Sequence, residues 1–296
     1  MSRFKFFDEE TENSTNSDQV KLFLKENENL NKRFMVQNHI CFYALGQKVT
    51  DVKTDMIWIV KSIKKNTLGI IVDVEIESHE VLNANPGFND MVEFAKAFNY
   101  PMAKLVLQLN ERGRVDAVLN QGEILERWNE IKQDVLTPLQ SSDQDKEVLR
   151  NGDIQFNNSL NSIQESLIYN LFFAPVFGGK KISQDSIVYS GDIFSQLFQN
   201  QRIPYELKES CTKLAENEVY LNHIAVIDKY TFSDFGKLYA KMYSELCGPK
   251  FLYETSFSSK YSYDIASGLI NECDAVFIER ANEKLKYESI YKIKVI

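Results

Sequence analysis

The stretch KLVLQLNERGRVDAVLNQGEILERWNEIKQDV, residues 104–135, predicts a hairpin followed by a helix. Leu105, Leu107 and Leu109 alternate with more polar residues, which is the period-2 pattern of a strand with one buried face. Gly113 lies in the turn that follows, where it can take the positive φ that a hairpin bulge needs. Alternation then resumes and predicts the returning strand, which carries Val115, Ala117 and Leu119.

The helix predicted after this hairpin has its own start signal. Asn120 can cap it, and Glu123 stands three residues later, where the acid of a capping box belongs. Glu123 is also placed to pair with Arg127 at i,i+4. One stripe of the helix is apolar and consists of Ile124, Trp128, Ile131 and Val135. All of these residues have scaffolding duties, so the stretch predicts structure and no chemistry.

Length and composition indicate a globular protein with a large core. The chain has 296 residues, of which 44% are hydrophobic, with 20 Phe and 14 Tyr. Its formal net charge is −8, which disfavours a general affinity for nucleic acid or for an anionic membrane. An acidic surface instead suits a basic partner protein.

The four cysteines, Cys41, Cys211, Cys247 and Cys273, are far apart in the sequence. They form no CxxC, and none is placed near a histidine at a ligand spacing typical of metal sites. The first ten residues lack the apolar core of a secretory signal, and no apolar run approaches the roughly 20 residues that span a bilayer. We therefore expect reduced thiols in a cytoplasmic protein that is not inserted in a membrane.

The order of the patterns predicts an α+β protein of two similar lobes, each an antiparallel, twisted sheet packed on helices. Residues 1–33 form an acidic segment with little to bury, which we expect to be mobile. The first lobe covers residues 34–140, a connecting helix and loop covers 141–180, and the second lobe covers 181–296.

The connecting segment predicts one long helix with a narrow apolar stripe, formed by Phe156, Leu160, Ile163, Leu167 and Leu171. Three aromatic residues, Phe172, Phe173 and Phe177, gather at its end. If exposed, they form an apolar patch that can receive a partner. If buried, they cement the two lobes. We name them as the candidate partner-binding residues.

No motif in the chain predicts a catalytic site. His39, His79 and His223 stand alone, without the HxH, HxxxH or HExxH spacings of metal sites, and His223 fits a satisfied core imidazole. There is no GxSxG turn for a serine nucleophile. Four acids are candidates for a catalytic carboxylate pair, although no spacing brings a particular two together: Asp228, Asp234, Glu245 and Asp264. Asp264 has a structural task in the turn before Gly268. The sequence thus predicts no catalytic residue, no metal and no cofactor.

The pattern LxLNxxGxVxxxxNxxEIxxxW, carried here by Asn110, Gly113, Asn120, Glu123, Ile124 and Trp128, resembles a hairpin–helix signature of uncharacterised Bacteroidota proteins. The later stretch YSYDIASGLI, with Asp264 and Gly268, looks like a hairpin shared by such proteins and by some exported bacterial lipoproteins. The chain differs from the lipoproteins in lacking a signal and a lipobox cysteine. The resemblance implies α+β architecture and bacterial origin, and no activity.

Three functions follow as hypotheses. The first is a non-enzymatic protein that binds another protein, such as a secretion-associated accessory factor or chaperone, or an immunity-type factor. The second is a small-molecule or lipid carrier with an apolar cavity between sheet and helix. The third is a hydrolase whose site is assembled from distant segments. The oligomeric state has no signal in the sequence.

Overall fold

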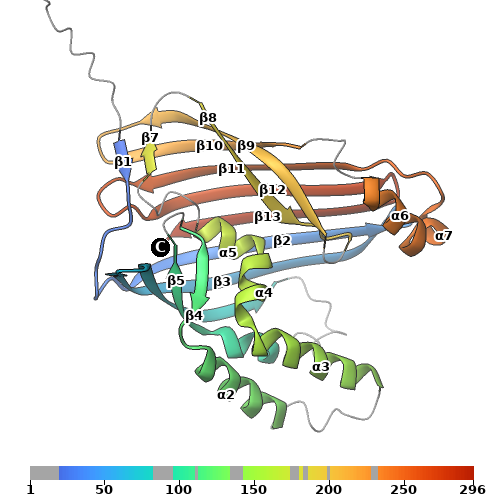
Figure 1. Cartoon of the computed structure of the whole chain (residues 1–296), viewed down its shortest axis with the longest axis horizontal. Coiled ribbons are helices and arrows are strands. Elements are labelled where there is room, and N and C mark those ends of the chain that lie inside the picture. Colours follow the sequence, from blue (N-terminus) through green and yellow to red (C-terminus); the bar gives the residue numbers. More distant parts are fainter. Residues whose placement is uncertain are drawn as a thin grey trace, which may run out of the picture.

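The structure is a computed structural model, and it describes residues 20–82, 96–110, 113–133, 143–173, 180–182, 186–198, 201–227 and 233–296. This part of the chain forms one large antiparallel sheet accompanied by helices (Figure 1). The prediction of a mixed α+β chain built on antiparallel pairing is therefore confirmed. None of the described helices combines the length and apolarity that a membrane crossing requires.

The large sheet has 11 strands in the order β6-β5-β4-β3-β2-β13-β12-β11-β10-β9-β8. The strands of its first half are β2 (Lys32–Ala44), β3 (Gln47–Asn66), β4 (Gly69–Val81), β5 (Lys104–Leu109) and β6 (Val115–Val118). Those of the second half are β8 (Ile187–Phe194), β9 (Arg202–Leu214), β10 (Glu218–Val226), β11 (Glu254–Asp264), β12 (Ile270–Asn282) and β13 (Leu285–Val295). A separate pair joins β1 (Val20–Leu22) to β7 (Lys180–Ile182).

The two halves meet in the middle of the sheet, where β2 pairs with β13 over a long register from Tyr43↔Lys286 to Phe34↔Val295. Each half is a simple up-and-down run: the first proceeds outward from this seam to β6, and the second proceeds inward from β8 to the seam, so the edge strands are β6 and β8. Strands of both predicted lobes thus belong to one hydrogen-bonded sheet. The division of the chain into two lobes as folding units stays a prediction.

The hairpin and helix predicted first are found where expected, as β5, β6 and α2 (Gln121–Ile131). Gly113 has a φ of 72°, and the register shifts beside it between Gln108 and Leu109, as in a bulge. Asn120 stands at the start of α2 but makes no capping bond. Its amide bridges β5 instead, accepting from Val106 N at 2.9 Å and donating to Lys104 O at 3.0 Å.

The predicted long helix is wrong in its continuity. The segment consists of α3 (Asp143–Asn157), α4 (Ser159–Glu165) and α5 (Leu167–Phe172), separated by Asn158 and Ser166. Ser166 is extended, with φ −77° and ψ 119°, so the chain changes direction between α4 and α5. Serine and asparagine have weak helix propensities, but neither Asn158 nor Ser166 makes a side-chain capping bond, and the same residue types also occur inside α4 and α5.

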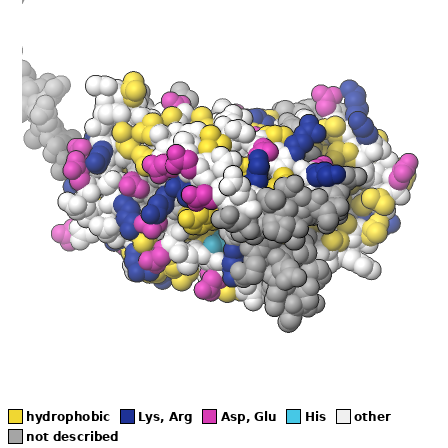
Figure 2. All heavy atoms as spheres, turned by 90° about the horizontal axis from the view of Figure 1, so that it is seen from below, with side chains coloured by type: hydrophobic (Ala, Val, Ile, Leu, Met, Phe, Trp, Pro, Cys, Tyr) yellow, Lys and Arg dark blue, Asp and Glu magenta, His cyan; other side chains and the backbone are white. Residues whose placement is uncertain are grey.

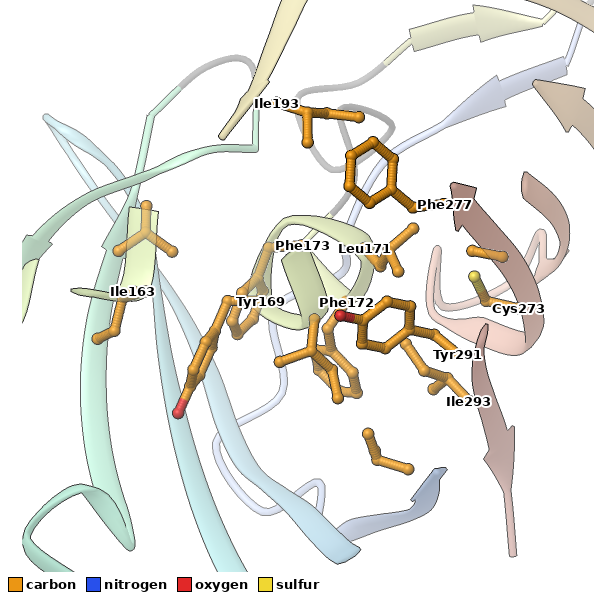
Figure 3. Close-up of a cluster of buried hydrophobic side chains, with 14 of the residues drawn as sticks. Ile163, Tyr169, Leu171, Phe172, Phe173, Ile193, Cys273, Phe277, Tyr291 and Ile293 are labelled. Carbon is orange, nitrogen blue, oxygen red and sulfur yellow. The ribbon is translucent and has the colours of Figure 1, made fainter. Parts of the chain in front are cut away.

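α5 is the centre of the core. Phe172 packs edge-on against Phe34 of β2 and at a tilt against Trp58 of β3, with ring centroids 5.0 Å apart in both pairs. On the other side, side chains of β12 and β13 approach α5, among them Phe277 and Tyr291 (Figure 3). α5 therefore joins both halves of the sheet through apolar contact.

The remaining helices lie around this core. α2 packs on α3 through the ring of Trp128, which contacts Phe156 at 4.8 Å between centroids and donates its N–H to Asp153 at 2.8 Å. The short 3-10 helix η2 (Tyr100–Met102) leads into β5. α6 (Ser233–Met242) and α7 (Ser244–Cys247) stand together at one end of the sheet (Figure 1), and α7 ends at Gly248.

Residues 20–33 belong to the segment predicted to be mobile, and here they are placed against the body. Leu22 and Leu24 are buried. The backbone N–H of Lys25 donates to the carbonyl of Ser267 at 2.9 Å. Leu30 also packs against the core, and β1 pairs with β7, so apolar contacts and backbone pairing together hold this segment. Residues 1–19 of the same prediction lie outside the described residues.

Candidate functional site

Hollows surround the α4–α5 segment on the inner face of the sheet. Ser166, the residue between the two helices, lines three of them, with volumes of about 210, 420 and 520 Å³. A further hollow of about 230 Å³ is lined by the neighbouring Glu165 and Leu167. The helices therefore leave the inner face only partly filled, and ligand-sized space remains on both sides of them.

The hollow of about 420 Å³, which we call the Trp58 pocket, lies between β3 and β4 and the α4–α5 segment. Its volume falls within the roughly 300–1,000 Å³ that is typical of small-molecule sites. Its apolar wall consists of Met56, Trp58, Ile76, Met102, Ile168 and Tyr169. Its polar lining includes Glu77, His79, Lys96, Asn99 and Gln155. The pocket is thus amphipathic, with an apolar wall and several polar groups.

A bulge in the β3–β4 ladder puts His79 into this pocket. Trp58 pairs with Ile76, but Met56 pairs with His79, because the register shifts between Ile57 and Trp58. Without that shift Ser78 would stand opposite Met56, and His79 would point to the other face of the sheet. The extra residue therefore adds an imidazole to a wall that is otherwise apolar.

Two polar atoms of the pocket residues have no partner in the described structure. Both Trp58 Nε1 and His79 Nδ1 are buried without a hydrogen bond. Leaving a buried polar group unsatisfied costs about 1–3 kcal/mol. The indole N–H can only donate, so it calls for an acceptor. Burial, with a smaller contribution from the charge of Lys96, lowers the pKa of His79, which keeps the imidazole neutral at pH 7.

The hollow of about 230 Å³, which we call the His223 pocket, lies where the two edges of the sheet come near each other. Arg114 and Val115, at β6, and Tyr189 of β8 all line it. α4 is tied to the first edge, since Gln164 Nε2 donates to the carbonyl of Val115 at 2.8 Å. The sheet thus curls around α4–α5, and the pocket fills the remaining gap.

Three polar side chains from adjacent strands form a row in the His223 pocket region. Glu209 of β9, His223 of β10 and Ser259 of β11 are direct register partners, so they share the inner face. His223 Nε2 lies 2.8 Å from Glu209 Oε2, and His223 Nδ1 lies 3.3 Å from Ser259 Oγ. All three residues are buried. The Tyr189 hydroxyl donates to the same Glu209 oxygen at 3.2 Å.

This row can support base chemistry. If His223 carries its proton on Nε2 and donates it to Glu209, then Nδ1 accepts from the Ser259 hydroxyl. A carboxylate then orients a base, and the base contacts a hydroxyl, which is the relation found in activated serine nucleophiles. His223 also has a partner on each ring nitrogen, in line with the satisfied core imidazole that its position in the strand predicts.

The candidate partner-binding aromatics do not form an exposed patch. Phe172 and Phe173 are 2% and 3% exposed, and they belong to the core around α5. The patch alternative is therefore wrong for these two residues, because the break at Ser166 turns α5 inward. Phe177 lies outside the described residues. Binding of another protein stays a prediction that rests on composition and net charge.

The described part of the surface in Figure 2 shows no continuous acidic region that would support binding of a basic partner protein. Lys and Arg side chains are interspersed with Asp and Glu side chains over the part of this face that is not grey. Neighbouring charges of opposite sign largely cancel at a distance in salt solution.

Two of the four candidate acids have other partners in the described structure. Asp234 is exposed and pairs with Lys237 at 3.0 Å. Asp264 has its turn role, since its Oδ2 accepts from the backbone N–H of Ser267 at 2.8 Å. Asp228 lies outside the described residues. The predicted Glu123–Arg127 pair is present, at 3.5 Å.

The sequence did not single out the pocket residues, because they fit the ordinary patterns of residues in strands. Trp58 reads as an ordinary strand residue between Met56 and Val60, and the bulge that turns His79 inward has no glycine or other local mark. The row of Glu209, His223 and Ser259 comes from three strands, and only the register brings it together. A histidine on the apolar face of a strand, such as His223, is the one available signal.

Comparison with known proteins gives no family. No family model matches the chain, and no curated protein matches it in sequence. A solved structure described as "lipid-protein interactions in lipovitellin" is similar over 94% of this chain, at 10% identity and a TM-score of 0.47. The chain spans about a quarter of that protein, since the match covers 25% of it. A TM-score of this size does not establish a shared fold.

Proposed function

We propose that the protein is a carrier for a small amphipathic molecule, which it holds in the Trp58 pocket. The observation that carries the proposal is the pair of buried, unpartnered nitrogens, Trp58 Nε1 and His79 Nδ1, in a pocket of about 420 Å³. A ligand with a hydrogen-bond acceptor satisfies the indole N–H, and it also satisfies His79 Nδ1 in the tautomer that carries its proton there. Its apolar part covers the wall formed by Met56, Ile76, Met102 and Ile168.

The charges around the pocket favour an acidic head group. The ammonium of Lys96 is near enough to help lower the pKa of His79, so it also attracts an anion there. Glu77, the acid in the lining, is engaged by Arg33 in an ion pair. A carboxylate would accept from the indole N–H of Trp58 and gain from the Lys96 charge. We therefore propose a carboxylic acid with an apolar tail, of the fatty-acid class.

Displacement of a fluorescent fatty-acid analogue tests this proposal. A medium-chain fatty acid should compete well, the matching alcohol less well, and the matching alkane least. Trp58→Phe keeps an aromatic ring and removes the donor, so it should weaken fatty-acid binding by about tenfold or more, the value of a hydrogen bond to a charged group. Trp128→Phe is the matched control, because Trp128 donates to Asp153 in a different cluster.

Two outcomes would contradict the carrier. One is that no analogue binds to the full chain at micromolar protein. The other is that Trp58→Phe and Trp128→Phe both bind the fatty acid with the same affinity as the wild type, which would place the ligand elsewhere. Replacing His79 with Phe gives a further check, because it removes the second unpartnered nitrogen and keeps a ring.

A second candidate function is favoured by the row in the His223 pocket. We propose that Ser259 acts as a nucleophile, His223 as its base and Glu209 as the group that orients the base, in an ester or thioester hydrolase. The support is the pair of distances, 3.3 Å from Ser259 Oγ to His223 Nδ1 and 2.8 Å from His223 Nε2 to Glu209. The adjoining space of about 230 Å³ fits a small acyl group.

Covalent labelling distinguishes this hydrolase from a structural row. A fluorophosphonate probe should label Ser259 in the wild type and should fail to label Ser259→Ala. His223→Gln should slow labelling by at least about 100-fold, the lower range for a general base. Ser262→Ala is the control, since Ser262 is a buried serine on the same strand outside the row. Absence of labelling at Ser259 in the folded wild type would overturn the proposal.

A further inference from the structure

A second cluster of polar side chains lies on the opposite, outer face of the sheet. Along β2, Ile40 and Phe42 pack against the core. His39 and Cys41 alternate with them and therefore point outward together. Asp51 of β3 is the register partner of Cys41, so it shares that outer face. Three different metal-ligand chemistries thus meet at one level of two neighbouring strands.

The ligand atoms of these residues are close together. His39 Nε2 lies 2.7 Å from Asp51 Oδ1 and 3.2 Å from Cys41 Sγ, and Cys41 Sγ lies 3.9 Å from Asp51 Oδ1. Around a tetrahedral zinc ion, bond lengths of about 2.0–2.3 Å place such atoms about 3.3–3.6 Å apart. The three distances bracket that range, so shifts of roughly half an ångström make room for the ion.

The surroundings hold the carboxylate in position. Lys48 Nζ contacts the other oxygen of Asp51, Oδ2, at 2.8 Å. Lys48 and then His39, as hydrogen-bond donors, lower the pKa of Asp51 to about 2, so this side chain is ionised at neutral pH. Cys41 is buried, and burial raises the pKa of its thiol. Glu288, the β13 residue across from Cys41, is engaged by Lys286 at 2.6 Å.

We propose that His39, Cys41 and Asp51 form a site for a divalent transition-metal ion of the zinc type. Nitrogen, sulfur and oxygen ligands in a set of three suit Zn²⁺ and Co²⁺ better than Mg²⁺ or Ca²⁺, which prefer oxygen alone. Water completes the fourth position. Binding converts the Cys41 thiol to a thiolate and releases its proton to solvent, while neutral His39 carries its proton on Nδ1, which leaves the Nε2 lone pair for the ion.

The spacing His39-x-Cys41 was present in the sequence, contrary to the expectation that no cysteine stands near a histidine at ligand spacing. A spacing of two residues in a strand suits metal ligands, because the two side chains point to the same face of the sheet. Among the residues that the structure describes, this is a group of histidine, cysteine and carboxylate whose ligand atoms all lie within 4.8 Å of one another. The site does not depend on the carrier function, since it lies on the other face of the sheet.

Titration of the full chain with Co²⁺, after treatment with a chelator and a reductant, tests the site. A thiolate–cobalt charge-transfer band should appear, together with the visible bands of four-coordinate cobalt, and both should saturate at one ion per chain. Added Zn²⁺ should displace Co²⁺ and so remove both sets of bands. Cys41→Ser should abolish the charge-transfer band, and His39→Gln or Asp51→Asn should weaken binding at least about tenfold, as even supporting residues of metal sites do.

Cys211→Ser is the control, because Cys211 is a partly exposed thiol outside the cluster, and it should leave the titration unchanged. If the wild type gives no charge-transfer band, or if Cys211→Ser removes it while Cys41→Ser does not, the proposal is overturned. Circular dichroism of each variant guards against loss of the fold. Asp51→Asn, at an exposed position, supplies a variant that should fold like the wild type.

Discussion

The turn at Gly268 ties the second half of the sheet to the N-terminal segment. Gly268 has a φ of 73°, and a Cβ at this position would collide with the carbonyl oxygen of Phe23. The neighbouring carbonyl of Ser267 accepts from the N–H of Lys25 at 2.9 Å. The glycine is therefore required both for its backbone angle and for the close approach of another segment.

We predict that Gly268→Ala lowers the free energy of unfolding by more than Gly46→Ala. Gly46 also has a positive φ, of 76°, but open space surrounds its Cβ position. Gly46→Ala should cost about 1–2 kcal/mol for the left-handed backbone alone. The collision with Phe23 should add at least about 1 kcal/mol at Gly268. Urea denaturation of both variants measures the difference. Equal midpoints would show that the backbone at Phe23 moves away from the new Cβ at no cost, which would contradict the prediction.

Glu279 is a buried acid, and its protonation should make the free energy of unfolding depend on pH. It is fully buried on β12 and accepts from the N–H of Gln196 at 2.7 Å and from the hydroxyl of Tyr253 at 2.8 Å. Burial raises its pKa above the ordinary 4.5, and these hydrogen bonds oppose the rise. Its contribution to stability is then fully present below pH 4.5 and is lost as the pH rises through the raised, folded-state pKa.

We therefore predict that raising the pH from mildly acid to neutral destabilises the wild type relative to Glu279→Gln, which cannot ionise. Urea unfolding at a series of pH values should show this difference in free energy changing in one direction. Glu245→Gln, at an exposed acid, is the control and should run parallel to the wild type. A difference that changes in the opposite direction would mean that hydrogen bonding outweighs burial at Glu279.

At the scale of elements, α5 carries more of the core than its six residues suggest. Phe172 is 2% exposed and contacts rings from two strands. Phe172→Ala should lower the free energy of unfolding by about 3–5 kcal/mol, the usual cost of a phenylalanine cavity. Leu246→Ala, at 64% exposure on α7, should change it by no more than about 0.5 kcal/mol. A loss below about 1 kcal/mol for Phe172→Ala would show that α5 is not the centre of the core.

Local patterns in the sequence predict elements well where one face is buried. The alternating leucines of β5, the glycine turn at Gly113 and the described part of the α2 stripe are found, whereas Val135 lies outside the described residues. The same rules fail at Ser166, because apolar spacing continues through the break and no proline or glycine marks it. That missed break has consequences for function, since Ser166 lines three of the hollows on the inner face.

At the scale of the whole molecule, the seam between β2 and β13 decides how the halves are joined. The first and last long strands of the described chain pair with each other, and no local pattern contains that information. The two halves of the sequence have similar patterns of strands and helices, and these patterns predict two lobes. Long-range register also assembles both pockets, so their residues could not be grouped from the sequence.

We predict that the two halves unfold as one cooperative unit. Amides of β3 in the first half and of β12 in the second should exchange with the same free energy of opening, because the seam between them is fully paired. The edge strands β6 and β8 should open more easily and serve as the internal comparison. Hydrogen exchange with mass spectrometry measures all four strands, and two distinct free energies of opening for β3 and β12 would instead support two lobes that fold as separate units.

The most direct test of the carrier is the NMR signal of the indole N–H groups. The chain has two tryptophans, so an ¹⁵N-labelled sample gives two side-chain signals, which Trp58→Phe and Trp128→Phe assign. On titration with a medium-chain fatty acid, the Trp58 signal should move downfield as its N–H gains an acceptor, while the Trp128 signal, already bonded to Asp153, should stay in place. A Trp58 signal that does not move at a saturating concentration, or that moves no more than that of Trp128, would contradict the account.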